Sequence, residues 1–509
     1  MKTKTREKLQ KELDSQKTEL FRNQMGQYAT PTALADEIVR LGLSYLEDKD
    51  IGFIDPAFGL GAFYDSLERI APAFKKIISK ATGVEIDAHY FGPSTKLWKD
   101  SLIEVINSDF TKLKAPKKDE NKYNFMVCNP PYVRHHHIKS EDKSRLQSLV
   151  FEQLGVKSSK LMGLYGYFMM LSHQWLSKDG VGVWLVPTEF LDVNYGLAIK
   201  EYLVSRVSIL RVHTFRAEDV QFTDALVTST IIVFKNTTSD ENHSIIFTKG
   251  SNLDRPINSI SISQSQLDSR KKWSRLIAGA LEPKETTLRF GDVFSIKRGI
   301  ATGSNSFFII SKDEAKKRNI PKEFLQPVLP SSRYVNSRII ESADDGSPIG
   351  KKELFLFNCH LAENILQKAY PDVYAYVQEG REKGISEGYI CKNRSPWYKQ
   401  EQRKSPDLFI SYMGRSRNGK SPFKFYLNRS KAIATNGYLM IYIKPEYKSI
   451  LEDESNGRLK SLVQCLTDEI LISGGRSYGG GLYKLEPSEL ANIPLQGIKI
   501  EPPQQMLAI

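Results

Sequence analysis

Short apolar, β-branched runs recur along the first half of the chain, and longer segments of mixed polarity separate them. Seven of these runs predict strands, at residues 52–55, 81–86, 104–107, 125–128, 181–186, 208–214 and 226–234. Intervening segments such as residues 64–78 and 165–176 fit helices. Because strands that alternate with helices favour a parallel sheet, we predict an α/β domain with a doubly wound, mostly parallel sheet.

The alternation ends at a polar stretch over residues 236–243, whose Thr, Ser, Asp and Asn residues predict a loop or a domain boundary. The short mixed segments that follow are rich in Gly, Pro and Ser and predict a less regular α+β domain. We therefore predict a first domain over residues 1–245, with a surface helix at residues 1–24, and a second domain over residues 246–509.

The composition is that of an ordinary globular protein, with 40% hydrophobic and 26% charged residues among 509. No run approaches the roughly eighteen consecutive apolar residues of a transmembrane helix, and the basic N-terminus lacks the apolar core of a secretory signal. The four cysteines are too few and too scattered for a disulfide framework or a paired-cysteine metal site. We therefore expect a reduced, cytoplasmic setting without membrane contact.

Positive charge is concentrated in one part of the predicted second domain. The chain carries 72 Lys and Arg against 59 Asp and Glu, a formal net charge of +13, and residues 392–431 hold eleven of these cations with only two acids. Cations at this density can neutralise phosphates, and the aromatic residues between them either pack a core or stack on bases. A solvated basic face over a small β core fits the pattern equally well. The candidates for nucleic-acid contact are Lys392, Arg394, Arg415, Arg417, Lys420 and Lys424.

The first predicted strand ends in an acid and continues into a loop with two glycines. Such glycines let the backbone turn tightly beneath a ligand and open the next helix. The full dinucleotide fingerprint is absent, because Tyr64 occupies its third glycine position, and this counts against NAD. The residues of this candidate loop are Asp55, Pro56, Ala57, Gly59 and Gly61.

Acids also follow the next two predicted strands. Glu85, followed by Ile86, ends the second strand, where a carboxylate can accept both hydroxyls of a ribose. After the third strand, the Asp109 carboxylate can accept from an adenine amino group and Phe110 can flank the ring. Any one of these acids fits a helix N-cap. Three acids at successive strand ends, Asp55 included, favour a nucleoside site, because open α/β sheets bind ligands at that edge.

The most specific pattern is Asn129-Pro130-Pro131-Tyr132, directly after the fourth apolar run. The two prolines hold the backbone extended and withhold two amide donors. The Asn129 side-chain oxygen and the Pro130 carbonyl can accept both hydrogens of an exocyclic amino group, and Tyr132 can stack on the base. A β-edge turn with a packed tyrosine is the alternative. The position after three nucleoside-type strand ends favours the catalytic interpretation.

These motifs resemble the adenine-N6 DNA methyltransferases of the gamma arrangement, in which cofactor motifs precede the catalytic motif and a target-recognition domain follows. The resemblance covers roughly residues 24–235 motif by motif, and the C-terminal half by layout. It implies that residues 1–245 form an S-adenosylmethionine-binding catalytic domain of the methyltransferase type. It also implies that residues 246–509 recognise the DNA target.

The resemblance assigns roles to individual residues. Thr30 and Pro31 lie in the segment Gly26-Gln27-Tyr28-Ala29-Thr30-Pro31, which is similar to the N-terminal cofactor-contacting segment, where Thr30 would touch the methionine portion. Phe168 would pack on the cofactor adenine, and Phe222 would lie against the flipped base, although Thr223 follows it where some relatives have Pro. The implied catalytic residues are Asn129, Pro130, Pro131, Tyr132 and Phe222. The remaining implied cofactor residues are Asp55, Pro56, Ala57, Gly59, Gly61, Glu85, Ile86, Asp109, Phe110 and Asn129.

The activity implied is methyl transfer from S-adenosylmethionine to N6 of an adenine swung out of double-stranded DNA. The layout is most often that of the modification part of a restriction–modification pair, so we expect a partner endonuclease and a monomeric enzyme. Consecutive side chains in His135-His136-His137 point in different directions and no matching cluster lies nearby, so we expect no metal.

Three alternatives remain open on the sequence. A methyltransferase could act on cytosine N4, although that subgroup more often has Ser in place of Asn129. It could act on a protein glutamine, although such enzymes need no large basic C-terminal domain. A non-catalytic DNA-binding protein is the third alternative, and the intact Asn129-Pro130-Pro131-Tyr132 set argues against it.

Overall fold

The structure is a computed structural model of the 509-residue chain, and it describes most of that chain. The residues described are 2–216, 219, 221–222, 228–238, 243–277, 288–416, 421–452, 457–478 and 481–495. They divide into two compact units, Met1–Leu281 with Ser477–Gly481, and Glu282–Arg476 with Leu482–Ile509. Each unit is described by itself.

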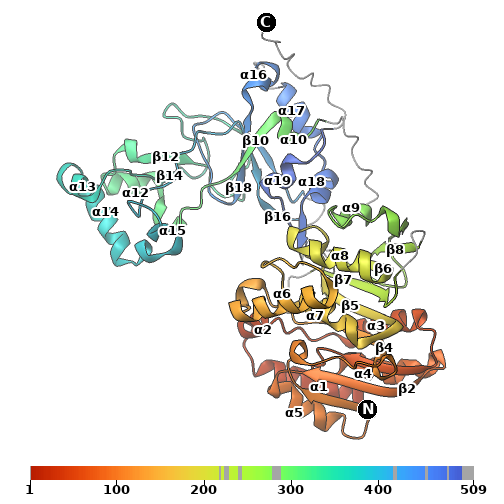
Figure 1. Ribbon diagram of the computed structural model, residues 1–509. Coiled ribbons are helices and arrows are strands. Elements are labelled where there is room, and N and C mark those ends of the chain that lie inside the picture. Colours follow the sequence, from red (N-terminus) through yellow and green to blue (C-terminus); the bar gives the residue numbers. More distant parts are fainter. Residues whose placement is uncertain are drawn as a thin grey trace. The chain divides into compact units, whose positions relative to one another are not determined.

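A nine-stranded sheet forms the centre of the first unit, in the order β3-β2-β1-β4-β5-β7-β6-β8-β9 (Figure 1). The five strands from β3 to β5 are parallel, β7 is antiparallel to both β5 and β6, and β9 is antiparallel to β8. The predicted mostly parallel α/β sheet is confirmed. The strands are β1 (Asp50–Asp55), β2 (Ile77–Glu85), β3 (Ile103–Asn107), β4 (Tyr123–Cys128), β5 (Leu176–Pro187), β6 (Ser208–Thr214), β7 (Ser229–Lys235), β8 (Ser244–Lys249) and β9 (Asn258–Ser263).

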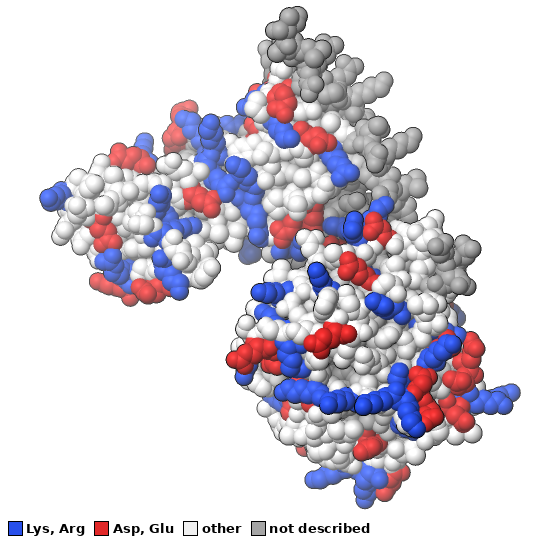
Figure 2. All heavy atoms as spheres, in the orientation of Figure 1, with Lys and Arg blue, Asp and Glu red and all other residues white. Residues whose placement is uncertain are grey.

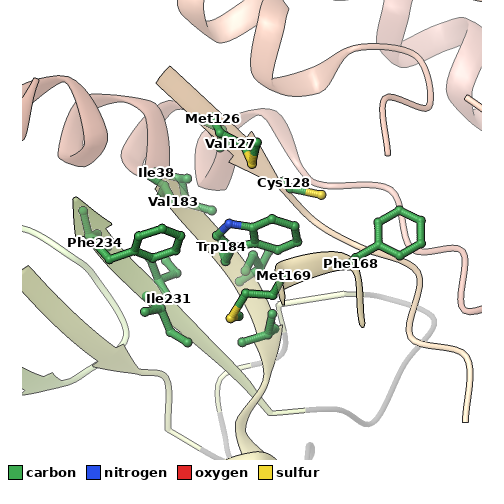
Figure 3. Packing of buried hydrophobic residues seen from close by; sticks show 14 of the residues in the cluster. Ile38, Met126, Val127, Cys128, Phe168, Met169, Val183, Trp184, Ile231 and Phe234 are labelled. Carbon is green, nitrogen blue, oxygen red and sulfur yellow. The ribbon is translucent and has the colours of Figure 1, made fainter. Parts of the chain in front are cut away.

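Helices cover both faces of this sheet. A Cβ placed on Gly42 of α3 would lie 2.7 Å from the Val183 side chain, so α3 packs closely over β5. Figure 3 shows the next residue, Trp184, beside Met169 of α7. Because successive side chains of a strand point to opposite faces, α3 and α7 lie on opposite sides of the sheet. The helices are α1 (Lys2–Ser15), α2 (Glu19–Met25), α3 (Thr32–Tyr45), α4 (Ala62–Ile70), α5 (Ala88–Leu97), α6 (Ser140–Leu154), α7 (Leu164–Ser172), α8 (Leu197–Arg206) and α9 (Trp273–Ile277).

Three predicted helices differ from the structure. The helix expected at residues 64–78 ends at Ile70, and a 3₁₀ turn with Pro72 leads into β2 at Ile77. Pro72 lacks the amide hydrogen that the next α-helical hydrogen bond requires, and Lys75, with φ at +55°, then turns the chain out of the helical region. The surface helix expected at residues 1–24 is two helices, α1 and α2, and Thr18 caps the second by accepting from the Phe21 amide. The helix expected at residues 165–176 is shorter, because α7 ends at Ser172.

The first unit also extends beyond the predicted range 1–245. The strands β8 and β9 lie past the polar stretch, yet β8 pairs in parallel with β6 and β9 pairs with β8. These pairings continue the nine-stranded sheet by two strands, and the division of the chain falls between Leu281 and Glu282. Both strands are short and carry many Ser and Thr residues, so their weak apolar pattern does not predict membership of the first sheet.

The second unit is an α+β structure, as predicted, and its described residues include a five-stranded and a three-stranded sheet. In the five-stranded sheet, β10 (Phe294–Arg298), β18 (Tyr438–Ile443), β15 (Leu408–Ser411), β17 (Phe425–Asn428) and β13 (Ile339–Ile340) are neighbours in that order. The three-stranded sheet consists of β11 (Ile309–Ser311), β14 (Leu354–Phe357) and β12 (Leu325–Val328). Two further strands of this unit are β16 (Met413–Arg415) and β20 (Leu482–Lys484), and β19 (Arg476–Tyr478) begins at the last residue before the segment that belongs to the first unit. The helices are α10 (Phe290–Val293), α11 (Asn305–Phe308), α12 (Lys312–Lys317), α13 (Glu363–Ala369), α14 (Pro371–Glu382), α15 (Tyr389–Lys392), α16 (Pro445–Leu451), α17 (Gly457–Gln464), α18 (Asp468–Gly474) and α19 (Pro487–Ala491).

Among the described residues, no helix has both the length and the apolar character needed to cross a membrane.

Candidate active site

The segment after α2 lies against the backbone that follows β4. Gly26 ends α2 with φ at +62°, and its carbonyl accepts a hydrogen bond from the Tyr132 amide at 3.1 Å. A Cβ at this position would lie 2.3 Å from the Tyr132 nitrogen. Both the left-handed backbone and the close approach require glycine here. The backbone of the N-terminal segment therefore packs directly against the Asn129-Pro130-Pro131-Tyr132 set and is hydrogen-bonded to it.

Asn129 is held by its nitrogen and leaves its oxygen open. Its Nδ2 donates to the Tyr28 carbonyl at 3.0 Å and to Thr30 Oγ1 at 3.1 Å. A carbonyl oxygen can only accept, so this contact fixes which end of the amide is the NH₂ group. The Asn129 Oδ1 atom is buried and has no hydrogen-bond partner among the described residues. A buried acceptor without a partner is costly, which is typical of a site that a ligand completes.

The two prolines keep this stretch free of amide donors. Pro130 is buried and Pro131 half-buried. In the described parts of the chain, nothing donates to the Pro130 carbonyl. Two unused acceptors, Asn129 Oδ1 and the Pro130 carbonyl, thus belong to consecutive residues after β4.

Four aromatic rings surround this point. Tyr132 is buried, and its hydroxyl donates to the Leu185 carbonyl at 3.1 Å. Its ring centroid lies 5.6 Å from that of Tyr28, 6.2 Å from that of Phe222 and 6.4 Å from that of Tyr165. Burial raises the pKa of the Tyr132 hydroxyl, so it stays neutral. The structure therefore places Tyr132 and Phe222, which the sequence assigned to the same extruded base, near each other, and it adds Tyr28 and Tyr165 beside them.

The predicted cofactor acids lie at adjacent strand ends, on β1, β2 and β3. The Asp55 carboxylate is buried and accepts from the Ala57 amide at 3.0 Å, and burial raises its pKa to about 8. Glu85 accepts from the Gly59 amide at 2.8 Å and from the Asp87 amide at 2.7 Å. Burial raises the pKa of Glu85 as well. Both acids accept hydrogen bonds from the backbone of their loops. Because a buried carboxylate is costly without a partner, a cationic or hydroxyl-bearing ligand beside it is favourable.

The loop between Asp55 and α4 is open above one of its glycines. Gly59 has φ at +54°, and a Cβ built on it would meet nothing within 4 Å. A Cβ on Gly61, with φ at +79°, would lie 2.5 Å from the Phe58 ring. Gly61 is therefore needed for packing, whereas Gly59 leaves room for a ligand to approach the backbone. Pro56 is buried and Ala57 half-buried in the same loop.

Beyond β2 and β3, one predicted cofactor residue is exposed and the others are packed. Ile86 is 62% exposed, which leaves an apolar side chain open at the strand end. Asp109 accepts from both the amide and the hydroxyl of Thr111, so it is an N-cap. Phe110 and Phe168 are buried with centroids 5.6 Å apart, so they form the floor of this edge. Arg145, which sequence reasoning missed, donates to the Thr111 carbonyl at 3.0 Å.

A cavity of about 750 Å³ opens beside Tyr28 and Tyr132. Its walls also include Pro187 and Thr228, Glu19 of α2, and the 3₁₀ turn His135–His137 with Arg134 before it. No group of three or more His, Cys, Asp and Glu residues that could hold a metal occurs in the described parts of the chain.

In the second unit, the basic stretch is a charged surface over a packed core. Its aromatic residues are buried: Trp397, Tyr398, Phe409, Tyr412, Phe423, Phe425 and Tyr426. They pack the core, and of the two alternatives for them base stacking is wrong. Figure 2 shows Lys and Arg gathered on the visible face near β18 and the loops beside it.

The six candidate DNA-contact residues differ in their surroundings. Arg394 donates to the Thr302 carbonyl at 3.0 Å and the Ala301 carbonyl at 2.8 Å, so it holds a loop together. Lys392 and Arg415 are exposed, and Lys424 is half-buried. Arg417 and Lys420 lie outside the described residues.

The sequence of this chain is similar to those of known type II methyltransferases over most of its length. Residues 63–221 match the family of the Eco57I restriction-modification methylase, and residues 271–507 match the C-terminal domain of the type II methyltransferase M.Eco57I. The chain is 27% identical over 489 residues to the type II methyltransferase M.AccI of Acinetobacter calcoaceticus, covering 92% of this chain and 85% of the relative. It is 23% identical over 476 residues to M.XamI of Xanthomonas campestris pv. amaranthicola, covering 91% and 84%.

One solved structure resembles the chain over most of its length. This is the type IIL restriction-modification enzyme MmeI in complex with DNA, with a TM-score of 0.56 and 14% identity. The match covers 91% of this chain and 64% of the length of that enzyme. At this identity the likeness concerns the fold.

Proposed function

We propose that this chain, which is similar to type II restriction-modification methyltransferases over most of its length, transfers the methyl group of S-adenosylmethionine to N6 of an adenine extruded from double-stranded DNA. The single observation that carries the proposal is the Asn129 amide. Its nitrogen is fixed by Tyr28 and Thr30, and its buried Oδ1 has no partner among the described residues.

The chemistry of this acceptor pair suits an exocyclic amino group. Such a group presents two N–H donors in one plane, and Asn129 Oδ1 and the Pro130 carbonyl are two acceptors on consecutive residues. Accepting both hydrogens holds the nitrogen and directs its lone pair away from the ring system. The prolines add no competing amide donor. Catalysis then rests on position and electrostatics.

The residues at the ends of β1 and β2 fit S-adenosylmethionine. The cofactor has a positively charged sulfonium and amino group, a ribose and an adenine. Asp55 and Glu85 are buried carboxylates with raised pKa values, and an adjacent positive charge or hydroxyl stabilises their ionised form. The exposed Ile86 provides an apolar contact for a flat ring. When bound, the cofactor supplies an electrophilic methyl group.

The aromatic rings around Tyr132 suit a base that has left the helix. The target amino group is inaccessible in a duplex, so the nucleotide must swing out at a cost of a few kcal/mol. Stacking on aromatic side chains offsets about 1–3 kcal/mol of that cost per base. Tyr28 and Tyr132 line the cavity described above, and the Phe222 ring is packed behind Tyr28 with its centroid 5.6 Å away. Tyr28 and Tyr132 can provide this contact, and Phe222 supports the Tyr28 ring.

We assign DNA recognition to the second unit. The exposed cations Lys392 and Arg415 lie there, within the residues that carry eleven Lys and Arg against two acids. The proposal includes a cytoplasmic, monomeric enzyme and a partner endonuclease that cuts the same DNA sequence unless it is methylated. Size-exclusion chromatography with light scattering tests the monomer, and cleavage of unmethylated DNA by the product of a neighbouring gene tests the partner.

The central experiment uses labelled S-adenosylmethionine and bacterial genomic DNA that lacks the modification. After incubation the DNA is digested to nucleosides and the labelled product is identified. We expect N6-methyl-2′-deoxyadenosine. Label on cytosine or on protein, or no transfer at all, would overturn the proposal. Mapping the methylated adenines then gives the recognised sequence.

A further inference from the structure

A short basic turn follows the candidate catalytic residues and borders the same cavity. The turn consists of Arg134 and the 3₁₀ helix His135–His137, two residues after Tyr132. All four of its side chains line the cavity together with Tyr28 and Tyr132. The charge block of the second unit is far away in sequence, so the turn is a separate group of cationic and titratable side chains beside the proposed base site.

The side chains of the turn are available to a ligand. Arg134, His136 and His137 are exposed, and His135 is half-buried. In the part of the chain that the structure describes, none of the four side chains takes part in an ion pair or a hydrogen bond. The rings of His136 and His137 lie with centroids 4.2 Å apart. Four neighbouring side chains that can carry positive charge, without an internal counter-charge, suit an anion.

We propose that residues 134–137 bind the backbone phosphates that flank the extruded adenine. The inference rests on the proposed function, because a base that swings out carries its sugar and its flanking phosphates to the mouth of its pocket. The turn lies at that mouth, and Arg134 supplies a permanent charge with planar, bidentate donors. The three histidines add positive charge when they are protonated, and a bound phosphate favours the protonated form.

The histidine contribution is sensitive to pH. Slight burial and the neighbouring cationic groups of His137, His135, Arg134 and Lys143 lower the pKa of His136. His136 is therefore less readily protonated in the free protein than an isolated histidine. A phosphate raises the pKa of a histidine that it contacts, so DNA binding takes up protons and binding tightens as the pH falls.

Two acids also line the cavity, Glu19 of α2 and Glu189 after β5. Neither is changed in the variants described below, so their contribution to the pH dependence is the same in every protein compared. A change in DNA affinity between about pH 8 and pH 6 that occurs in the wild type and is lost when the turn is altered therefore comes from its histidines.

The test compares two sets of variants at this turn. In the first, Arg134→Gln is combined with His135→Gln, His136→Gln and His137→Gln, which removes charge and keeps polarity. In the second, the three histidines become lysines, which makes their charge permanent. The matched control replaces three exposed lysines, Lys114, Lys117 and Lys118, with glutamine, because they precede the amino end of β4 whereas the turn follows its carboxyl end.

DNA affinity is measured with a labelled duplex carrying the mapped methylation site, over a salt series at about pH 8 and pH 6. We expect the glutamine variant to make log K against log salt shallower by about 1–2, because each phosphate contact contributes about 0.9 to that slope. It should also lose the gain in affinity at lower pH. The lysine variant should bind as tightly as the wild type at low pH and keep that affinity at high pH. The control should match the wild type.

Equal salt slopes and equal pH dependence in the wild type and the glutamine variant would overturn the inference. Binding of S-adenosylmethionine and the melting temperature show that each variant is folded, and the lysine variant tests the site if the glutamine variant is not. The proposed function has its own outcome, since a wild-type protein that forms N6-methyl-2′-deoxyadenosine in DNA supports it whatever the turn does.

Discussion

The side-chain nitrogen of Asn129 donates a hydrogen bond to Thr30 Oγ1 at 3.1 Å, although the two residues lie 99 positions apart in the sequence. The sequence resemblance gave Thr30 a contact with the cofactor. In the structure Thr30 is buried and holds the amide whose other end, Oδ1, has no partner in the described residues. Thr30 is thus a positioning residue for the proposed catalytic acceptor.

Two substitutions of Thr30 should distinguish the contribution of its hydroxyl group from that of its packing. Thr30→Val keeps the shape and removes the acceptor, so the Asn129 amide loses one of two restraints. A hydrogen bond of this kind contributes about 1 kcal/mol, so the rate of methyl transfer should fall by about fivefold to tenfold. Single-turnover transfer to DNA measures this. Thr30→Ser keeps the hydroxyl and should restore most of the rate, and equal rates in the two variants would contradict the role.

Replacing Asn129 should remove transfer and leave cofactor binding. Asn129→Ala deletes the proposed acceptor for the amino group, and removal of one such polar group from a catalytic site costs about 10²–10³ in rate. Calorimetric titration with S-adenosylmethionine should show affinity near that of the wild type. A variant that neither binds the cofactor nor melts cooperatively would indicate a structural role instead.

Gly26 should not tolerate a side chain. Gly26→Ala places a Cβ 2.3 Å from the Tyr132 nitrogen and keeps φ at +62°, so the segment must shift away from the catalytic set. We expect the free energy of unfolding to fall by at least about 2 kcal/mol, together with reduced transfer. Urea denaturation measures the stability. Gly350→Ala is the matched control, because its Cβ would meet nothing within 4 Å and its φ is not in the left-handed region, so stability should be nearly unchanged.

Asp55 should make stability depend on pH. Its folded pKa is raised to about 8 from an ordinary value of 3.8, so the folded protein holds a proton that the unfolded chain releases. The resulting stability is fully present below about pH 4 and is lost as the pH rises toward 8, by up to about 1.4 kcal/mol per pH unit. Asp55→Asn should lack this dependence. Urea denaturation of both proteins between about pH 5 and pH 8 should show the wild type gaining stability over the variant as the pH falls.

The basic surface of the second unit should contribute to DNA affinity without affecting the cofactor. Exchanging Lys392, Arg415 and Lys424 for glutamine should weaken duplex binding, and the salt dependence should flatten by about 0.9 for every phosphate that these cations neutralise in the wild type. Fluorescence anisotropy with a labelled duplex measures both effects. The same exchange at the exposed residues Lys8, Lys96 and Lys99 of the first unit is the control. A fall in cofactor affinity in the first variant would contradict the proposed division of roles.

Most strands of the nine-stranded sheet, though not their order, follow from local sequence patterns. Each of the seven predicted strands overlaps an observed strand, and residues 208–214 coincide with β6. Apolar runs bury both faces of a parallel strand, so the pattern is contained in a few consecutive residues. The candidate site residues at the strand ends could be predicted for the same reason, because Asp55, Glu85 and Asn129 directly follow such runs.

Two features depend on residues that are distant in the sequence. They are the strands β8 and β9 and the surroundings of the aromatic residues in the basic stretch. The strands β8 and β9 carry little apolar pattern, and they are strands because β6 offers an edge to pair with. The aromatic residues of the basic stretch could serve either a core or a base until the structure placed Tyr398 and Phe409 fully inside.

By itself, the sequence determined the α/β architecture, the acids at the strand ends and the Asn129-Pro130-Pro131-Tyr132 set, because each is a pattern of neighbouring residues. Only the tertiary structure decided which end of the Asn129 amide is free. That choice depends on Gly26, Tyr28 and Thr30, about a hundred residues earlier, whose backbone packs within hydrogen-bond distance of the set. A hydrogen bond between distant segments requires the fold to bring them together, and no local pattern contains that distance.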